Sequence, residues 1–347
     1  MENKKKILWE SLFLVLVFGG TVYGVFHGED IGKNIQIIKE TKKIFMIPAI
    51  MCVILFIWGE SLIIYYMTNS MNIKLKKWTC FLFSSVGFFF SCITPSASGG
   101  QPAQIYYMKR KKVPVPVSTV VLMVVTITYK AILVIAGIGM LILGQKFIHQ
   151  YLDDILPVFY LGIALNVICV GFMILLVFDT KLAKSLICQM LSIFEKLHIV
   201  RYKQSRHEKL EYGMTKYQET AVYFKNHKHV VVHVLMITFL QRFMLFLSTY
   251  FVYKAFELDG TSLMTIVMLQ AAISISVDML PLPGGMGISE KLFMTIFVPV
   301  FTSDLLLPGM ILSRGISYYT QLLLCAALTL TAHFTIGRKS KIKRELV

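Results

Sequence analysis

The chain has 347 residues, of which 56% are hydrophobic and only 16% are charged. An average soluble domain carries roughly a quarter charged residues, and the mean hydropathy is +0.68, so a soluble globular enzyme is excluded. There are 35 Lys and Arg against 19 Asp and Glu, which leaves a formal charge of +16. Because the basic residues form short clusters between long apolar runs instead of a basic face on a polar domain, nucleic-acid binding is excluded too. The composition is typical of a polytopic membrane protein.

Apolar runs long enough to cross about 30 Å of hydrocarbon as helices predict six full membrane spans. In chain order they cover residues 7–26, 44–67, 117–143, 156–178, 230–253 and 307–334. No small-residue cleavage site follows the first run, so we expect it to stay as a membrane anchor instead of leaving as a signal peptide. Two further apolar regions, 79–108 and 262–301, are each interrupted near the middle by a cluster of Pro and Gly.

The distribution of Lys and Arg predicts the orientation. If the amino terminus is cytoplasmic and each interrupted region enters and leaves on one side, 25 basic residues fall in inside segments and 6 in outside segments. By the positive-inside rule, both termini are then cytoplasmic. The side on which the chain emerges leaves two topologies open for each interrupted region, because a re-entrant hairpin and a pair of full crossings both return the chain to the same side. The total is six spans plus two hairpins, or up to ten spans.

We interpret residues 1–347 as a single integral membrane domain with a first half (1–178), a cytoplasmic connector (179–228) and a second half (229–347). Apolar residues recur at helical spacing in the connector beside Lys, Arg and Glu, which predicts two amphipathic helices near the membrane surface. These residues are Leu182, Leu186, Met190 and Phe194, then Leu210, Met214, Tyr217, Ala221 and Phe224. The six cysteines lie mostly in apolar stretches without the spacing of a metal site or disulfide framework, and we expect them to fill apolar space.

The two interruptions are candidate binding sites. Segment 94–102 reads TPSASGGQP, and segment 281–290 reads PLPGGMGISE. Irregular backbone at membrane depth is tolerated only where protein buries it or where it lines a hydrated cavity, and the helix after each break can turn its amino-terminal amides toward an anion such as phosphate. The breaks occupy matching places in halves of opposite orientation, which predicts an inverted repeat whose interrupted segments meet near the midplane. The alternative is a pair of tight loops at the surface.

Ionisable residues inside the predicted spans strengthen this interpretation. They are Glu60, Lys130, Arg242 and Arg314. Each costs roughly 2.5 to 3.5 kcal/mol on insertion scales unless it is paired or hydrated. One interpretation is a buried salt bridge, for example between Glu60 and Lys130, that only fixes helix packing; the other is a cavity that receives an anionic head group. Asp278 and Glu290 flank the second break, and we expect them to hold the loop or balance cations instead of acting as an acid–base pair.

No residue pattern predicts a metal site, a cofactor or a catalytic group. The histidines lie mostly in loops or at span ends, and no phosphate-binding loop, dinucleotide fingerprint or catalytic-triad spacing occurs.

The two interruptions together resemble the membrane domain of the bacterial lysylphosphatidylglycerol synthase and flippase family. The resemblance rests on segment 94–102 with Tyr106, Tyr107, Met108 and the basic cluster after it, and on the more specific Pro-Gly-Gly-x-Gly-x-x-Glu of segment 283–290. It covers nearly the whole chain. Many relatives carry Gly-Glu-Pro and a following Arg where this chain has Gly100-Gln101-Pro102 and Gln104, so the charge preference of the first hairpin does not carry over from the family.

The resemblance implies a flippase-like protein of the bacterial cytoplasmic membrane, which translocates an anionic or aminoacylated phospholipid or a polyprenyl-phosphate lipid. In long family members a soluble domain that transfers lysine from charged tRNA to phosphatidylglycerol follows the membrane domain, and we expect that domain to be missing here. Two alternatives stay open: a phosphatidylglycerol lysyltransferase, and an accessory subunit of a separately encoded synthase. The expected substrate-binding residues are Ser96, Ser98, Gly99, Gly100, Gln101, Gln104, Lys130, Arg242, Gly284, Gly285, Gly287, Glu290 and Arg314, with Glu60 and Asp278 balancing charge.

Overall fold

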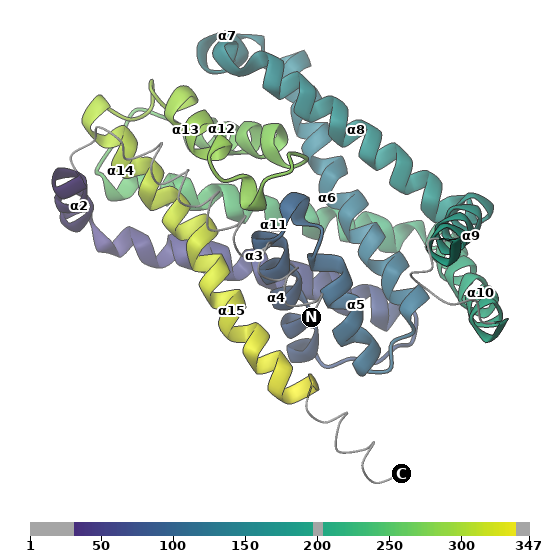
Figure 1. Cartoon of the computed structure of the whole chain (residues 1–347). Coiled ribbons are helices and arrows are strands. Elements are labelled where there is room, and N and C mark those ends of the chain that lie inside the picture. Colours follow the sequence, from purple (N-terminus) through teal and green to yellow (C-terminus); the bar gives the residue numbers. More distant parts are fainter. Residues whose placement is uncertain (1–30, 197–203, 338–347) are drawn as a thin grey trace.

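The computed structural model describes residues 31–196 and 204–337, and within these ranges the chain is helical without any strand (Figure 1). The first predicted span, 7–26, lies outside the described residues. The α-helices are α2 (Ile31–Glu40), α3 (Met46–Ser70), α4 (Lys77–Ile93), α5 (Gly100–Arg110), α6 (Val115–Leu143), α7 (Gln145–Tyr151), α8 (Leu156–Phe178), α9 (Thr180–Lys196), α10 (Gln204–Asn226), α11 (Lys228–Ala255), α12 (Leu263–Val277), α13 (Ile288–Ile296), α14 (Ser303–Arg314) and α15 (Gln321–Ala332). Short 3₁₀ or π segments connect or extend them, namely η1 (Lys43–Phe45), η2 (Pro95–Ala97), η3 (Asp153–Ile155), η4 (Pro283–Gly285), η5 (Gly315–Thr320) and η6 (His333–Gly337).

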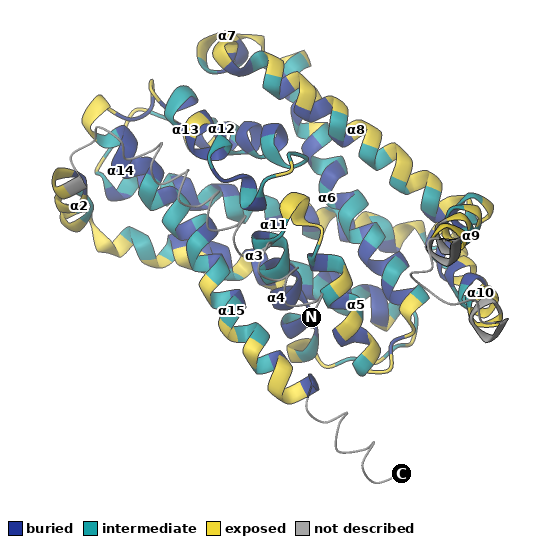
Figure 2. Ribbon diagram, in the orientation of Figure 1, coloured by how far each residue is buried: buried dark blue, intermediate teal, exposed yellow. Residues whose placement is uncertain are grey.

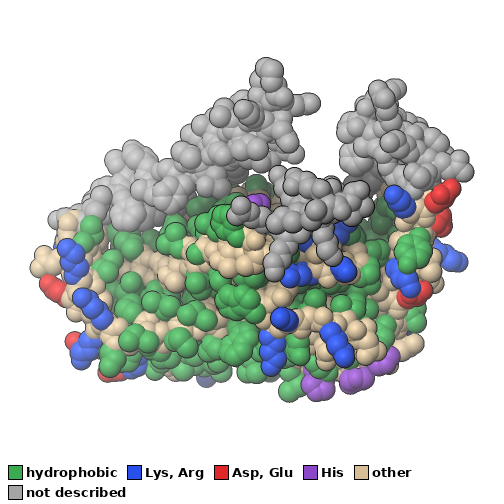
Figure 3. Space-filling view, turned by 90° about the horizontal axis from the view of Figure 1, so that it is seen from below, with side chains coloured by type: hydrophobic (Ala, Val, Ile, Leu, Met, Phe, Trp, Pro, Cys, Tyr) green, Lys and Arg blue, Asp and Glu red, His purple; other side chains and the backbone are tan. Residues whose placement is uncertain are grey.

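Five helical runs in the described part of the chain are long and apolar enough to cross a membrane. They are Lys43–Ser70, Val115–Leu143, Asp153–Phe178, Lys228–Ala255 and Ser303–Gly337. They confirm the other five predicted spans, and several extend a few residues further than the apolar runs because a helix continues through its polar ends. Figure 3 shows hydrophobic side chains over much of the described surface, with charged side chains at both sides of the view and a group of Lys and Arg between them. The protein is therefore a multi-pass membrane protein.

Each interrupted region forms a helix, a break and a shorter helix. The first consists of α4, η2 and α5, and the second of α12, η4 and α13, and in both the second helix packs against the first. At 1.5 Å per residue, α4 and α12 are only about 26 and 23 Å long, and α5 and α13 are shorter still. These lengths favour re-entrant hairpins over full crossings of about 30 Å, and re-entry stays a prediction.

The two halves run in opposite directions. The long helices α3 and α11 pack side by side, with the Lys42 amide donating to the Ala255 carbonyl at one end (3.0 Å) and the Tyr223 hydroxyl, just before α11, donating to the Ser70 carbonyl at the other (2.7 Å). Because α4 follows the end of α3 and α12 follows the end of α11, the two hairpins enter from opposite ends. The breaks then meet, since η2 packs against η4.

Apolar packing surrounds this meeting point on both sides. One core cluster unites α3, α4, α5, α6 and α10, and a second unites α6, α8, α12, α13 and α14. Between them, Cys92, Met286 and Tyr318 join the two breaks to the last span. Figure 2 shows the exposed residues along the outer sides of α8 and α15.

The connector contains the two predicted amphipathic helices, α9 and α10. Four of the apolar residues expected on α10 are buried: Met214, Tyr217, Ala221 and Phe224. They pack mainly against α6, so this face of the connector is attached to the transmembrane helices.

Candidate functional site

A cavity of about 560 Å³ lies where the two breaks meet. Its walls include residues from both hairpins and from all five candidate spans. The polar residues that the spans contribute lie near the middle of their helices, for example Glu60 in α3, Tyr129 in α6 and Arg242 in α11. The cavity is therefore placed at about half the height of the spans, as expected for interrupted helices that form a site near a midplane.

Most of the predicted site residues line this cavity. They are Ser96, Ser98, Gln101, Gln104, Lys130, Arg242, Gly284, Gly285 and Arg314, together with Glu60 and Asp278. Gly99, Gly100, Gly287 and Glu290 are not in the wall. Gly100 serves helix packing, because a Cβ there would lie 2.1 Å from the Ser91 hydroxyl of α4. A role of the lining residues in binding stays a prediction.

The two breaks begin with the same backbone conformation. In each, a Pro is followed by two residues in the left-handed region, Ser96 (φ 49°) and Ala97 (φ 54°) in the first break and Gly284 (φ 57°) and Gly285 (φ 65°) in the second. Glycine adopts this region without penalty, whereas other residues pay roughly 1–2 kcal/mol. Gly284 is also required sterically, since a Cβ would lie 2.1 Å from the Tyr318 ring. The first break therefore holds two strained residues beside the cavity.

Glu290 organises the Pro-Gly-Gly motif. Its carboxylate accepts hydrogen bonds from the Gly287 amide (2.7 Å) and from Arg314 Nε (2.8 Å), and Arg314 also donates to the Gly284 carbonyl (3.1 Å). The prediction that Glu290 holds the loop is confirmed. The Gly287 amide is thus already bonded, as is the Gly99 amide, which donates to the Thr94 hydroxyl (2.9 Å). These two amides are therefore not available to an anion.

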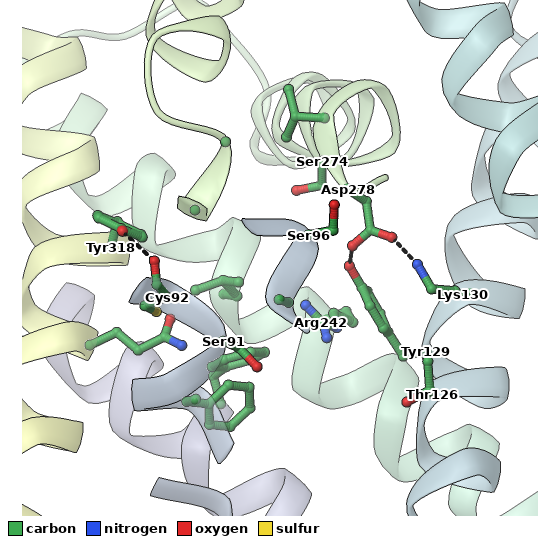
Figure 4. Close-up of a pocket in the computed structure, with 18 of the residues that line it drawn as sticks. Ser91, Cys92, Ser96, Thr126, Tyr129, Lys130, Arg242, Ser274, Asp278 and Tyr318 are labelled. Atoms are coloured by element: carbon green, nitrogen blue, oxygen red, sulfur yellow. Dashed lines mark hydrogen bonds and ion pairs between the residues drawn. The ribbon is translucent and has the colours of Figure 1, made fainter. Parts of the chain in front are cut away.

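Lys130 pairs with Asp278 and not with Glu60, so the example of a Glu60–Lys130 salt bridge is wrong. The Lys130 ammonium and the Tyr129 hydroxyl both donate to the Asp278 carboxylate, one to each oxygen (Figure 4). Asn166 Oδ1 of α8 lies 3.4 Å from the same ammonium. This pair connects α6 to the end of α12, where the second break begins.

Hydrogen bonds from uncharged donors hold the first hairpin beside the cavity instead. Gln104 donates to the Glu60 carboxylate (2.7 Å), and Gln101 donates to the Thr126 hydroxyl (2.6 Å). The Tyr318 hydroxyl donates to the Cys92 carbonyl at the end of α4 (3.0 Å). The first hairpin is therefore fixed by amides and hydroxyls, whereas ion pairs fix both ends of the second break.

Arg242 differs from the other two cations in the cavity wall. In the described ranges it makes no hydrogen bond or ion pair, and its Nε is buried without a partner. Its guanidinium carbon lies 3.5 Å from the centre of the Tyr129 ring and 5.0 Å from that of Phe56. Contacts with the ring faces leave the in-plane donors unused, because an Arg donates up to five hydrogen bonds around the edge of its guanidinium. A cation with open donors thus faces a cavity lined by polar groups.

Two structurally important residues were not predicted. Asn166 is buried and bonds to the Gly162 carbonyl and to Lys130; an amide in the middle of an otherwise apolar span is the signal that could have identified it. Tyr318 lies in the π segment η5 that directly follows Arg314. Such π segments occur often at functional sites, but the local sequence gives no sign of this one.

Comparison with known families connects this geometry to a membrane domain. The model of the family described as lysylphosphatidylglycerol synthase TM region matches residues 8–325. The chain belongs to this family. The matched range contains both breaks and every residue of the cavity wall, and the resemblance inferred from the two motifs is confirmed. A comparison with curated proteins finds no match.

Proposed function

We propose that the chain is a lipid translocase. The phosphate-containing head group of a membrane lipid enters the cavity between the two breaks, while its acyl chains remain in the surrounding bilayer. The observation that carries this proposal is Arg242, whose guanidinium lines the cavity and, in the described residues, has neither a hydrogen bond nor a salt bridge, although the charge of Glu60 attracts it. The shared chemistry of the substrate is a phosphate ester, as in anionic or aminoacylated phospholipids and polyprenyl-phosphate lipids.

Charge pairing supports phosphate as the missing partner. A buried cation is costly unless a counter-charge or hydrogen bonds compensate it. Lys130 and Arg314 have such partners in Asp278 and Glu290. Guanidinium binds phosphate through two parallel hydrogen bonds, so a head-group phosphate supplies what Arg242 lacks.

The basic residues support an orientation with both termini in the cytoplasm of a bacterium. Arg110, at the end of α5, donates to the Gly337 carbonyl at the end of the last span, and the connector meets the end of α3 through Tyr223 and Ser70. The basic clusters 74–77 and 109–112 and the described parts of the connector, 181–196 and 204–228, therefore gather at one end of the bundle, which is the cytoplasmic end by the positive-inside rule.

The test is a translocation assay with purified protein in liposomes that contain fluorescent phosphatidylglycerol, in which dithionite quenches only the outer leaflet. Wild-type protein is expected to move the probe from the inner to the outer leaflet, where dithionite quenches it. Arg242→Gln is expected to slow this movement at least tenfold, which corresponds to a free-energy difference of roughly 1.4 kcal/mol. Lys146→Gln is the matched control, because it removes an exposed cation from α7, outside the cavity. Absence of wild-type translocation, or equal rates in Arg242→Gln, would contradict the proposal.

A further inference from the structure

The Lys130–Asp278 pair occupies an unusual position between the two halves of the molecule. Its side chains are only 10% and 12% exposed, yet both residues line the cavity. Asp278 lies directly after α12 at the start of the second break, and Lys130 lies in the middle of α6. Rearrangement of this one pair would therefore alter both the charge of the cavity wall and the attachment of the second hairpin to α6.

The surroundings of the pair contain few other titratable groups. In the described part of the chain, those facing it are Tyr129 on α6, Cys169 on α8 and Arg242 on α11. The first hairpin contributes the neutral Ser96 and α12 the neutral Ser274 to the same region (Figure 4). Asp278 balances Lys130, and Glu60 on α3 is the carboxylate whose charge attracts Arg242.

Two cations face that ring. Arg242 lies 3.5 Å from its centre, and the Lys130 ammonium lies 5.5 Å from it. Like charges so close together repel strongly in a desolvated site. The negative charge of Asp278 compensates this repulsion, and a bound phosphate can compensate it equally well. Asp278 and a head-group phosphate are therefore alternative counter-ions for Lys130.

We propose that Asp278 takes up one proton when an anionic head group binds, and that the protein thereby couples lipid movement to a proton gradient. This inference rests on the proposed function. The proton forms an O–H bond on the carboxylate, the ion pair with Lys130 breaks, and the ammonium, still charged, binds the phosphate together with Arg242. When the phosphate leaves, the proton dissociates and the ion pair forms again. One proton and one negative charge enter together, so the formal charge of the cavity does not change.

The same exchange loosens the second hairpin. Breaking the Lys130–Asp278 pair removes its ionic attachment to α6, while the Glu290–Arg314 pair still attaches α13 to α14. The first hairpin has no ion pair to lose in the described residues, because amide and hydroxyl bonds hold it. Proton uptake thus changes one hairpin selectively.

The first experiment measures the transbilayer distribution of fluorescent phosphatidylglycerol in proteoliposomes with and without an imposed pH gradient. If one proton moves with each lipid, a gradient of about two pH units changes the distribution up to about 100-fold, with lipid leaving the acidic side. Asp278→Asn imitates the protonated residue and is expected to abolish the response to pH. Asp304→Asn is the matched control, since Asp304 forms an exposed ion pair with Lys33, and it should respond as the wild type does.

The second experiment records infrared difference spectra on addition of short-chain phosphatidylglycerol. The carbonyl band of a protonated carboxylic acid should appear in the wild type and in Asp304→Asn, and should be absent in Asp278→Asn. If this band appears but no lipid crosses the bilayer under any gradient, the proposed function fails and lipid-linked proton uptake stands. If lipid crosses equally with and without a gradient, or if no band forms in the wild type, the coupling inference is overturned.

Discussion

Arg242 and Tyr129 form the central contact of the cavity, with the guanidinium carbon 3.5 Å from the ring centre. The hydroxyl of the same ring donates to Asp278. The Tyr129 side chain therefore positions Arg242 through the face of its ring and the Lys130–Asp278 pair through its hydroxyl. A ligand that moves the Arg242 guanidinium therefore also affects the Tyr129 ring. Through the hydroxyl of that ring it affects Asp278, at the start of the second break.

Substitution of Tyr129 separates these two roles. Tyr129→Leu removes a cation–π contact that is worth about 2 kcal/mol in a desolvated site, so the affinity for short-chain phosphatidylglycerol should fall at least about tenfold. Tyr129→Phe keeps the ring and should retain most of this affinity, while losing a hydrogen bond to a charged acceptor worth about 1.5–3 kcal/mol of stability. Lipid titration and thermal unfolding in detergent measure the two effects. Equal affinities of the two variants would contradict this assignment.

The Glu290–Arg314 pair should behave as a buried structural pair. Its side chains are 5% and 17% exposed. Removing one partner leaves a charge without compensation, so Glu290→Ala should destabilise the protein by about 3–5 kcal/mol. The exposed pair of Lys33 and Asp304 is the control, because breaking a surface pair costs about 0–1 kcal/mol. Thermal unfolding in detergent should show a large loss for Glu290→Ala and a small one for Asp304→Asn; losses of the same size would refute the structural role.

The left-handed residues of the breaks predict opposite effects of two substitutions. Ala97→Gly should stabilise the protein by about 1 kcal/mol, because glycine adopts the observed φ of 54° without strain. Gly284→Ala should be destabilising, because it introduces the same strain and a methyl group 2.1 Å from the Tyr318 ring. Unfolding midpoints that move in the same direction would show that the breaks do not have this conformation.

Two glycines of α8 test the packing beside the cavity. A Cβ on Gly162 would lie 2.3 Å from the Ile275 carbonyl of α12, whereas a Cβ on Gly171 would meet nothing within 4 Å. Gly162→Ala should cost about 1–3 kcal/mol through overpacking. Gly171→Ala in the same helix should be neutral or stabilising by up to about 1 kcal/mol, since alanine is the better helix former. A lower unfolding midpoint for Gly162→Ala alone indicates close contact between α8 and α12. Lower midpoints for both variants would indicate instead that α8 is destabilised by alanine at either position.

Much of this architecture follows from local sequence. Hydropathy identifies the five described spans because a span must be apolar over its whole length, and the Pro and Gly clusters locate both breaks because these residues disrupt regular helix. Glu290 could be assigned to the loop because a carboxylate three residues after Gly287 reaches its amide. These features depend on residues close together in the chain.

The ion pairing in the cavity could not be predicted in this way. Lys130 and Asp278 are 148 positions apart, and the order of the spans is compatible with a pair of Lys130 with either Glu60 or Asp278. The selection depends on the contact of α12 with α6 and α8, which no local pattern specifies. The same holds for Arg242: only the structure shows that Glu60 is bonded to Gln104 and Asp278 to Lys130, and that Arg242 forms no salt bridge within the described part of the chain.

The central claim, a hydrated cavity between the breaks that receives a phosphate head group, is tested most directly by thiol labelling. Ser98 is exposed in the cavity wall, so Ser98→Cys in a chain without its six native cysteines should react with a membrane-impermeant thiol reagent. Short-chain phosphatidylglycerol should protect this cysteine from the reagent when Arg242 is present and fail to protect it in the Arg242→Gln background. A cysteine that does not react, or equal protection in both backgrounds, would contradict the account.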